Sequence, residues 1–223
     1  MSLARLIWKW PDGLVWKLTS GLTVGSRRKK FKMFLRAMSP SPSTSILDVG
    51  ASGVASSERA ENFLEEWYQH PESITAVGIE DLSAFKKRYP KVKTVETDGA
   101  RLPFSDKQFD IVFSNAVIEH VGGAKRQEEF VAECLRVGKR VFITTPSRSF
   151  PIESHTMIPL AHWLPVDVRN IIYQTLGRKH EGMPGELTLL TGRSLKRLFP
   201  TESKVRILRQ RLLFWTSVLI AIV

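Results

Sequence analysis

The sequence contains almost no cysteine and no long uninterrupted hydrophobic segment. Its 223 residues include a single cysteine, Cys134, so a disulfide within the chain is excluded. Because disulfides persist mainly in oxidising compartments, this favours a reducing compartment, and we expect a cytoplasmic protein. The apolar residues near the N-terminus are interrupted by Arg5, Lys9 and Pro11, which argues against a secretory signal peptide.

The longest apolar run, LLFWTSVLIAIV, lies at the C-terminal end of the chain, at 212–223. It is shorter than a membrane-spanning helix, which needs about 20 residues. Both this run and the segment KVRILRQR before it contain Val, Ile and Leu in a pattern suited to strands. We therefore predict a final pair of strands, in which the apolar C-terminus is a buried strand rather than a segment lying on a membrane.

Acidic residues are too few to balance the basic ones. The chain has 33 Lys and Arg residues against 22 Asp and Glu residues, a net charge of +11, which favours partners that carry phosphate groups. Part of the excess is the run SRRKKFK at 26–32, just after Trp8, Trp10 and Trp16. This run is either a solvated basic face or, because lysine and tryptophan settle at lipid interfaces, a peripheral contact with the inner face of a membrane. Nucleic acid is the third interpretation.

Two changes in composition divide the chain. Residues 1–38 form a predicted N-terminal helical extension interrupted at PDG, and a serine- and proline-rich linker follows from residue 39. We expect residues 39–223 to form one domain. Within it, residues 147–200 lose the regular pattern and are rich in proline, glycine and aromatic residues. We interpret 147–200 as an insertion that caps the substrate site.

Short apolar segments alternate with amphipathic segments between residues 45 and 146. The predicted strands are 45–50, 73–80, 92–98, 109–116 and 139–146. The predicted helices are 56–70, with Ser56 or Ser57 as N-cap, 82–90 and 125–137. Strands separated by helices pair in parallel through right-handed crossovers. The sequence therefore predicts an α/β fold, a Rossmann-like doubly wound and mainly parallel sheet of about seven strands with an antiparallel C-terminal strand.

The turn after the first predicted strand, DVGASG at 48–53, lies where open α/β sheets bind ligands. Gly50 and Gly53 allow the backbone to approach a ligand closely, and Asp48 ends the strand as a hydrogen-bond acceptor. The spacing differs from the G-x-G-x-x-G of a dinucleotide site, and no lysine follows as in a phosphate-binding loop. A nucleoside ligand without a pyrophosphate remains.

A second series of residues occurs in a specific order: Asp98, then Leu102-Pro103-Phe104, then Phe109-Asp110. Together with the turn at 48–53, the series resembles the class I S-adenosylmethionine-dependent methyltransferases over residues 45–146, in particular the type 11 group that includes small-molecule and quinone-biosynthesis enzymes. The resemblance implies a methyltransferase domain over 39–223 with S-adenosylmethionine as its cofactor. It implies cofactor contacts at Asp48, Gly50, Ser52, Gly53, Glu80, Asp81, Asp98, Gly99, Ala100 and Asn115.

The resemblance also implies roles within this set. Glu80 would hold the ribose hydroxyls, Asp98 would lie beside the adenine, and the segment NAVIEHVGG after the fourth strand would line the methyl-transfer site. The chain departs from the family pattern D-x-G-x-G-x-G at the first turn. There Ser52 replaces the middle glycine, and the next glycine comes one position early, at Gly53.

Methyl transfer requires an in-line nucleophile and the exclusion of water, and it requires no metal. An acceptor that loses a proton needs a base, for which the candidates are His120 after the fourth strand and His155 and His162 in the cap. The many apolar residues of the cap favour a partly apolar acceptor. We therefore expect a small molecule, a lipid or a lipid-linked glycan.

Two other functions stay open at this point. One is a protein that binds S-adenosylmethionine without turnover, which would show affinity for the cofactor and no methyl transfer. The other is a nucleic-acid methyltransferase, which would use the positive charge of the chain. The sequence has SNAVIE where the signature N/D-P-P-[YF] is expected after the fourth strand, and this argues against nucleic acid as the substrate.

Overall fold

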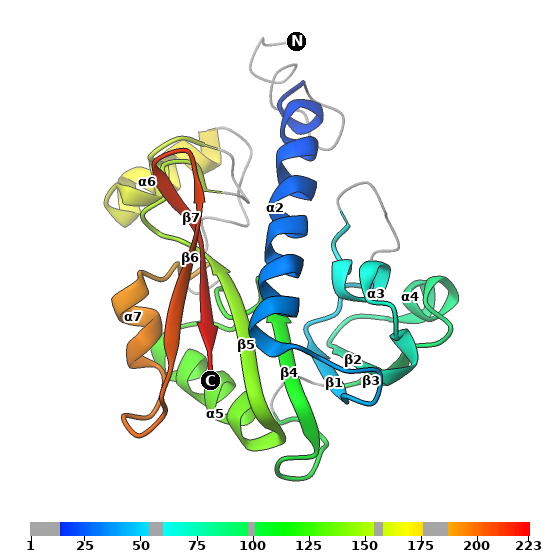
Figure 1. Ribbon diagram of the computed structural model, residues 1–223. Helices are drawn as coiled ribbons and strands as arrows, with labels where there is room; N and C mark the ends of the chain where they lie inside the picture. The colour runs from blue at the N-terminus through cyan, green and yellow to red at the C-terminus, as the bar shows by residue number, and fades with distance from the viewer. Residues whose placement is uncertain (1–13, 54–59, 98–100, 154–157, 176–186) are drawn as a thin grey trace.

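The structure is a computed structural model, and it describes residues 14–53, 60–97, 101–153, 158–175 and 187–223. A seven-stranded sheet with the strand order β3-β2-β1-β4-β5-β7-β6 crosses the molecule (Figure 1). The strands are β1 (Ile46–Val49), β2 (Ile74–Gly78), β3 (Lys93–Glu96), β4 (Phe109–Asn115), β5 (Gly138–Pro146), β6 (Arg206–Leu212) and β7 (Trp215–Ile222). The helices are α2 (Leu14–Met38), α3 (Phe63–Trp67), α4 (Ser83–Arg88), α5 (Ala124–Val137), α6 (Val166–Thr175) and α7 (Gly192–Arg197), with the 3-10 turns η1 (Pro71–Ser73) and η2 (Ala161–Trp163).

The pairing of the strands confirms the predicted fold class. Strands β1 to β5 pair in parallel, and β7 pairs antiparallel with both β5 and β6. From β1 the chain passes outward to β2 and β3, and it then crosses back to β4 on the other side of β1. The strand order therefore reverses between β1 and β4, which is the position where open α/β sheets bind their ligands.

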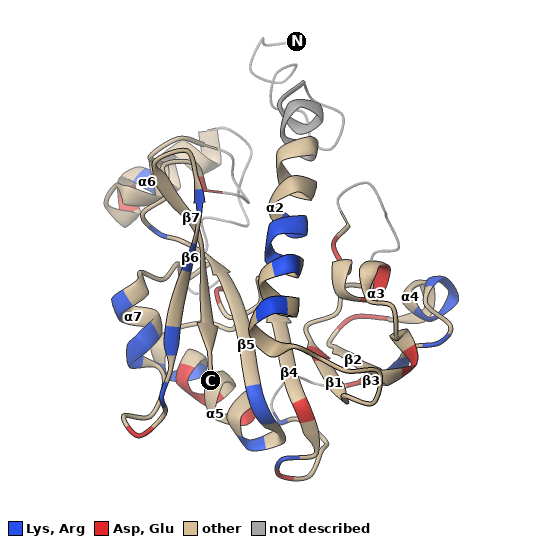
Figure 2. Cartoon of the chain, in the orientation of Figure 1, with Lys and Arg blue, Asp and Glu red and all other residues tan. Residues whose placement is uncertain are grey.

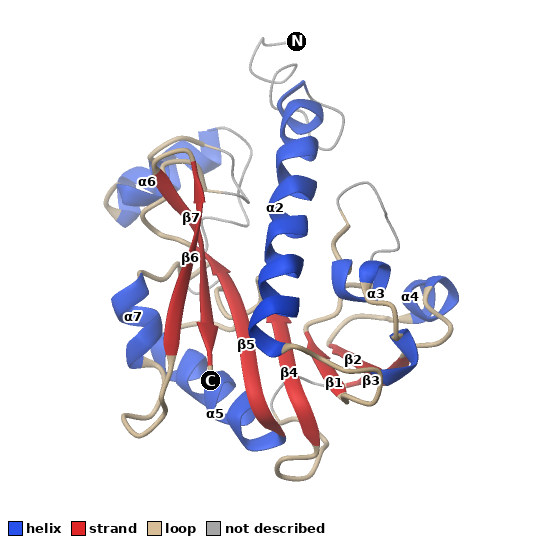
Figure 3. Ribbon diagram, in the orientation of Figure 1, coloured by secondary structure: helices blue, strands red, loops and turns tan. Residues whose placement is uncertain are grey.

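Helices cover both faces of the sheet (Figure 3). Neighbouring residues of β1 point to opposite faces because side chains alternate along a strand. Ile46 belongs to the core that also contains buried residues of α2, α3 and α4, whereas Leu47 belongs to the core that contains residues of α5 and α7. The doubly wound arrangement thus follows from the alternation within a fully buried strand.

Helix α2, the described part of the predicted N-terminal extension, packs directly on the sheet. Phe34 is fully buried, with its ring centroid 5.2 Å from that of Phe113 in β4 and 5.4 Å from that of Phe142 in β5. Burial of such a ring stabilises the fold by about 2 kcal/mol. The division of the chain at residue 38 stays a prediction. Neither α2 nor any other helix in the described ranges is both long and apolar enough to cross a membrane.

The helix predicted at 56–70 is wrong in its extent, because α3 covers only Phe63–Trp67 of the described residues. Ala60 has a positive φ of 50°, and Asn62 has the non-helical φ and ψ angles of −95° and 57°. These two residues form a turn that a helix cannot pass through. The predicted N-caps, Ser56 and Ser57, lie outside the described residues.

The predicted final pair of strands is confirmed as β6 and β7, and residues 218–222 are buried as expected. The first residues of the apolar run are not buried: Leu213 and Phe214 are 83% and 94% exposed. The cause is the register of the sheet. Pro146, the last residue of β5, pairs with Val218, so the turn between β6 and β7 extends beyond the end of β5.

The predicted cap, residues 147–200, contains two kinds of structure. Ile158, Ala161 and Tyr173 form a small apolar cluster that joins η2 to α6. Helix α7 instead buries Leu195 in the same core as α5 and β7. The described residues that can act as a cap are therefore those between β5 and the end of α6.

Candidate functional site

The described candidate residues gather at the carboxyl ends of β1, β2 and β4. The turn at 50–53 follows β1, Glu80 and Asp81 follow β2, and Asn115 ends β4. Because β1 pairs with both β2 and β4, these residues meet where the strand order reverses. Asp98, Gly99, Ala100 and His155 lie outside the described residues, so their assignments stay predictions.

Gly50 holds the first turn against both neighbouring strands. Its backbone N–H and that of Ala51 both donate to the carbonyl of Val77 in β2, at 2.8 and 3.0 Å. Gly50 has a φ of +96°, and a Cβ at this position would lie 2.2 Å from Cγ2 of Val117 in the loop after β4. Only glycine combines this backbone conformation with this close approach.

Gly53 joins the same turn to the residues after β2. Its N–H donates to Oε2 of Glu80 at 3.2 Å, and a Cβ here would lie 2.4 Å from the carbonyl oxygen of Asp81. The Asp81 side chain accepts hydrogen bonds from the hydroxyl and backbone N–H of Ser83 at the start of α4, and these bonds lower the pKa of Asp81. Glu80 therefore lies against the glycine turn, whereas Asp81 is held by α4.

The backbone of Ser52 in this turn is fixed by Asn62, a residue that no sequence motif indicated. The buried side chain of Asn62 accepts a hydrogen bond from the N–H of Ser52 at 3.0 Å and donates one to the Ser52 carbonyl at 2.9 Å. Two reciprocal bonds thus set the backbone of the residue that replaces the family's middle glycine. Asn62 is ten residues away from Ser52 and outside any motif, so the pattern gave no signal for it.

Asp48 forms a buried pair with Glu65 of α3. The two side-chain carboxyl groups are close enough to affect each other's titration, and both residues are 5% exposed. Burial raises the pKa of Asp48 well above its usual range, the neighbouring Glu65 raises it further, and burial raises the pKa of Glu65 to about 7. Protonation of one of the two groups removes their repulsion. Asp48 thus faces Glu65 of α3 in this structure, and its predicted contact with a cofactor stays a prediction.

Lys30 reaches into the same edge of the sheet from α2. Its Nζ donates to Oδ1 of Asn115 at 2.5 Å, and Thr144 Oγ1 of β5 donates to the same oxygen at 2.9 Å. The ammonium group also lies 5.4 Å from the ring centroid of Phe63. Only 7% of Lys30 is exposed. Burial lowers the pKa of Lys30 to about 7, nearby Arg27 lowers it further, and Glu119 acts in the opposite direction.

The interpretation of 26–32 as a solvated basic face is therefore wrong for Lys30. Lys29 and Lys32 are exposed, but Lys30 is buried. The signal that distinguishes them is helical periodicity: Lys30 precedes Phe34 and Met38 at intervals of four residues, so all three lie on the face that packs on the sheet. A run of basic letters hides this difference.

The loop after β4 contains both a buried acid and an exposed histidine. Glu119 is fully buried and accepts a hydrogen bond from Thr145 Oγ1 of β5 at 3.0 Å, while its carbonyl accepts one from the N–H of Thr188 at 2.8 Å. The N–H of His120 donates to the Val117 carbonyl at 2.8 Å, and the residue is exposed. Glu119 thus anchors the loop, and the role of His120 as a base stays a prediction.

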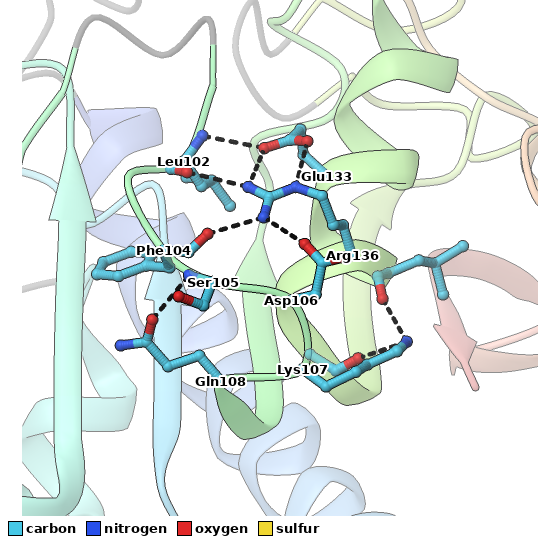
Figure 4. Close-up of polar contacts among 10 residues, drawn as sticks. Leu102, Phe104, Ser105, Asp106, Lys107, Gln108, Glu133 and Arg136 are labelled. Atoms are coloured by element: carbon cyan, nitrogen blue, oxygen red, sulfur yellow. Dashed lines mark hydrogen bonds and ion pairs between the residues drawn. The ribbon is translucent and has the colours of Figure 1, made fainter.

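The segment that carries the L-P-F motif is anchored to α5 through Arg136 (Figure 4). The Arg136 guanidinium donates to the carbonyls of Leu102 and Phe104 at 3.0 and 2.7 Å. It also pairs with Asp106 at 2.9 Å and with Glu133, whose pKa it lowers. A second oxygen of Glu133 accepts from the Leu102 N–H at 3.1 Å. These contacts fix the chain just after the predicted adenine-binding residues.

His162 of the cap lies in a separate place. Its Nε2 is 3.1 Å from the carbonyl oxygen of Arg148, and the ring is buried. Together with Arg148, Arg169 and Tyr173 it lines a cavity of about 180 Å³. His162 therefore ties η2 to the segment after β5, which favours a structural role over that of a base.

Comparison with known proteins places residues 47–141 in a family described as a methyltransferase domain. Two proteins of Mycobacterium tuberculosis, from the strains CDC 1551 and H37Rv, are each named a probable S-adenosylmethionine-dependent methyltransferase. Both are 36% identical to this chain over 66 residues, which are 28% of this chain and 23% of each relative. The chain thus covers less than a quarter of the length of these relatives.

Solved structures share the fold at low sequence identity. The magnesium protoporphyrin IX methyltransferase of Synechocystis PCC 6803, solved with bound SAH, has a TM-score of 0.57 at 12% identity and covers 98% of this chain and 91% of its own. An S-adenosylmethionine-dependent methyltransferase of Mesorhizobium loti has a TM-score of 0.53 at 14% identity and covers 89% and 99%. At these identities the likeness shows a shared fold.

Proposed function

We propose that this chain, whose residues 47–141 match a methyltransferase domain, transfers a methyl group from S-adenosylmethionine to a small-molecule or lipid-like acceptor. The observation that carries the proposal is the turn at 50–53. It lies where the strand order reverses, and it is held there by β2, by the loop after β4 and by Asn62.

The residues of this turn fit a nucleoside cofactor. A side chain at Gly50 or Gly53 would collide with its neighbours, so both positions present bare backbone to the edge of the sheet. Glu80 is exposed beside them, and a carboxylate can accept about four hydrogen bonds, so its bond to Gly53 leaves capacity for two ribose hydroxyls. The remaining proposed contacts, by family resemblance, are Asp48, Ser52, Asp81, Asp98, Gly99, Ala100 and Asn115.

Bound S-adenosylmethionine supplies an electrophilic methyl group on a positively charged sulfur. The residues of the chain have to place the acceptor in line with that group and exclude water. A second positive charge close by would oppose the binding of a sulfonium. The pKa of about 7 for Lys30 therefore favours cofactor binding as the pH rises through neutrality, when its amine loses the proton.

An acceptor that loses a proton needs a base. His120 and His155 are the proposed bases in the loop after β4 and in the cap. Lys30 joins them as a third candidate, because it is buried and bonded to Asn115, at the start of the segment that lines the methyl-transfer site in the family. With a pKa of about 7, its amine is neutral often enough near physiological pH to accept a proton.

A lipid-like acceptor is supported by the exposed apolar residues of the cap and by the net charge of +11. We also propose that the N-terminal segment, through Trp8, Trp10, Trp16 and the exposed Lys29 and Lys32, contacts the inner face of a membrane from the cytoplasm. Such a location would give the enzyme access to acceptors that partition into lipid.

The experiment that tests this function is transfer of a tritiated methyl group from S-adenosylmethionine. The purified chain is incubated with organic and aqueous extracts of the organism that encodes it, and each phase is counted. We expect label in the organic phase, its loss in Glu80→Ala, and its retention in Glu72→Ala, which removes an exposed acid at the opposite end of β2. Cofactor binding without label in either phase would favour a binding protein over an enzyme.

A further inference from the structure

Exposed large hydrophobic side chains are concentrated in one part of the described chain. Ten of the twelve belong either to residues 152–171 in the cap or to residues 213–215 between β6 and β7. Leu213, Phe214 and Trp215, which are consecutive, are 83%, 94% and 46% exposed. Exposed apolar side chains that gather in one place are typical of an interaction site.

The two segments meet at a pair of tryptophans. The ring centroids of Trp163 and Trp215 are 6.1 Å apart, and the Trp163 ring is fixed by a hydrogen bond of 2.7 Å from its Nε1 to the Arg148 carbonyl. We call the following residues the tip-and-cap patch: Trp163, Leu213, Phe214 and Trp215.

Positive charge flanks this patch. Strand β6 carries the exposed Arg209 and Arg211 in the half nearer the tip, whereas the exposed Arg206 lies at its far end, opposite Ile222; the strand appears in Figure 2 with blue segments along its length. Residues 203–223 contain no acidic residue. Arg211 is two positions before Leu213, so a cationic head group lies next to the apolar tip. Aromatic and aliphatic side chains beside arginines are the combination that settles at a lipid interface.

We propose that the tip-and-cap patch docks on an anionic membrane surface, with residues 213–215 inserted among the lipids and the arginines of β6 facing lipid phosphates. The shape and the charge favour this partner over others. The exposed side chains at the end of the hairpin extend away from the sheet, where they can enter a lipid layer. A second copy of the chain would bring arginine-rich tips together, whereas anionic lipid supplies the opposite charge.

Docking in this way turns the candidate site toward the bilayer. Because Pro146 pairs with Val218, residues 213–215 project past the carboxyl end of β5. Asn115 pairs with Thr144 near that same end, so the cofactor turn and the patch share one edge of the sheet. Delivery of a lipid acceptor to the site rests on the proposed function, but the docking itself does not.

The test is flotation of the full chain with vesicles of phosphatidylcholine alone and of phosphatidylcholine mixed with phosphatidylglycerol. The variants are Phe214→Ser, Phe214→Leu and, as a matched control, Ile79→Ser, which removes a side chain that is 75% exposed after β2, outside the patch. We expect binding to the anionic vesicles, a loss of about tenfold in Phe214→Ser, and near-normal binding in Phe214→Leu and Ile79→Ser. Binding should weaken as salt is added.

Three results would overturn the proposal. Vesicle binding that is absent in the wild type, or equal in the wild type and Phe214→Ser, would mean that the patch does not dock on lipid. A wild-type dimer that Phe214→Ser converts to a monomer would make the patch an interface between copies. Titration with S-adenosylmethionine separates this test from that of the function, because Phe214→Ser should bind the cofactor like the wild type.

Discussion

The turn after β1 and the tip-and-cap patch lie at the same edge of the sheet but are held in opposite ways. At the turn, bare backbone at Gly50 and Gly53 meets its neighbours, and the Ser52 peptide is bracketed by Asn62. At the patch, large side chains such as Phe214 point outward from the end of a hairpin. One region is specified by close contacts within the fold, and the other leaves its apolar surface for something outside it.

This difference separates two functions that share one edge. In the proposed site the cofactor is met by backbone geometry, which tolerates little change. An acceptor or a membrane is met by exposed side chains, which can vary without disturbing the sheet. Substitutions in one region should therefore leave the function of the other intact.

Gly50→Val should destabilise the fold through the turn at 50–53, without changing any side chain of the patch. A β-branched residue at a φ of +96°, with its Cβ 2.2 Å from Val117, should cost about 4 kcal/mol in unfolding free energy. Urea denaturation measures this cost. Gly25→Ala is the control, because nothing lies within 4 Å of its added Cβ and an alanine within α2 should stabilise by about 0.5 kcal/mol. Equal stability of the wild type and Gly50→Val would contradict this account of the turn.

The Asp48–Glu65 pair should make stability fall with rising pH. Glu65 titrates at about 7 when folded against 4.5 as its ordinary value, so the folded state binds more protons between those values. The wild type should therefore lose about 2 kcal/mol relative to Glu65→Gln between pH 5 and pH 7. Urea denaturation of both proteins at the two pH values measures the change. A difference that does not vary with pH would mean that the two carboxyl groups share no proton.

Asn62→Ala should loosen the turn without removing a glycine. Both hydrogen bonds to the Ser52 peptide are lost, which should cost about 1.5 kcal/mol in unfolding free energy and weaken cofactor binding about tenfold. Asn62→Asp keeps the acceptor for the Ser52 N–H, so its stability and its affinity for the cofactor should fall between those of the wild type and Asn62→Ala. If Asn62→Ala binds the cofactor like the wild type, the two hydrogen bonds from Asn62 to Ser52 have no part in the cofactor site.

The elements that could be predicted from the sequence are those with a local pattern. The strands and the helix α5 follow from apolar runs and amphipathic spacing, and the mainly parallel pairing follows from the alternation of strands and helices. The glycine turn was identified because φ above zero and close approach require glycine itself. The late start of the helix predicted at 56–70 was missed because it depends on the turn at Ala60 and Asn62, and the side chain of Asn62 bonds to a residue ten positions away.

The same limit applies to Lys30 and to Phe214. Lys30 belongs to a basic run that is typical of a surface. Only the packing of α2 on the sheet turns its side chain toward Asn115. Phe214 lies in an apolar run that predicts burial, but the register between β5 and β7 carries it past the sheet. Burial at these positions is decided by contacts between segments far apart in the chain, which no local pattern contains.

Lys30→Met should have the smallest effect, which is a change in how the free energy of unfolding depends on pH. The pKa of Lys30 is about 7 when folded and 10.5 ordinarily, so the unfolded state binds more protons above pH 7 and stability rises with pH. The wild type should gain about 1 kcal/mol relative to Lys30→Met between pH 6 and pH 8. Lys29→Met, on the exposed side of α2, should leave the slope unchanged. A wild-type slope that persists in Lys30→Met would assign the titration to another group.

We propose that the turn at 50–53 and Glu80 hold S-adenosylmethionine, and calorimetric titration of the purified chain measures this binding. We predict saturable binding by the wild type, its loss in Glu80→Ala, and unchanged binding in Glu72→Ala at the other end of β2. Absence of binding by the wild type, or equal affinity of Glu80→Ala and Glu72→Ala, would contradict the claim.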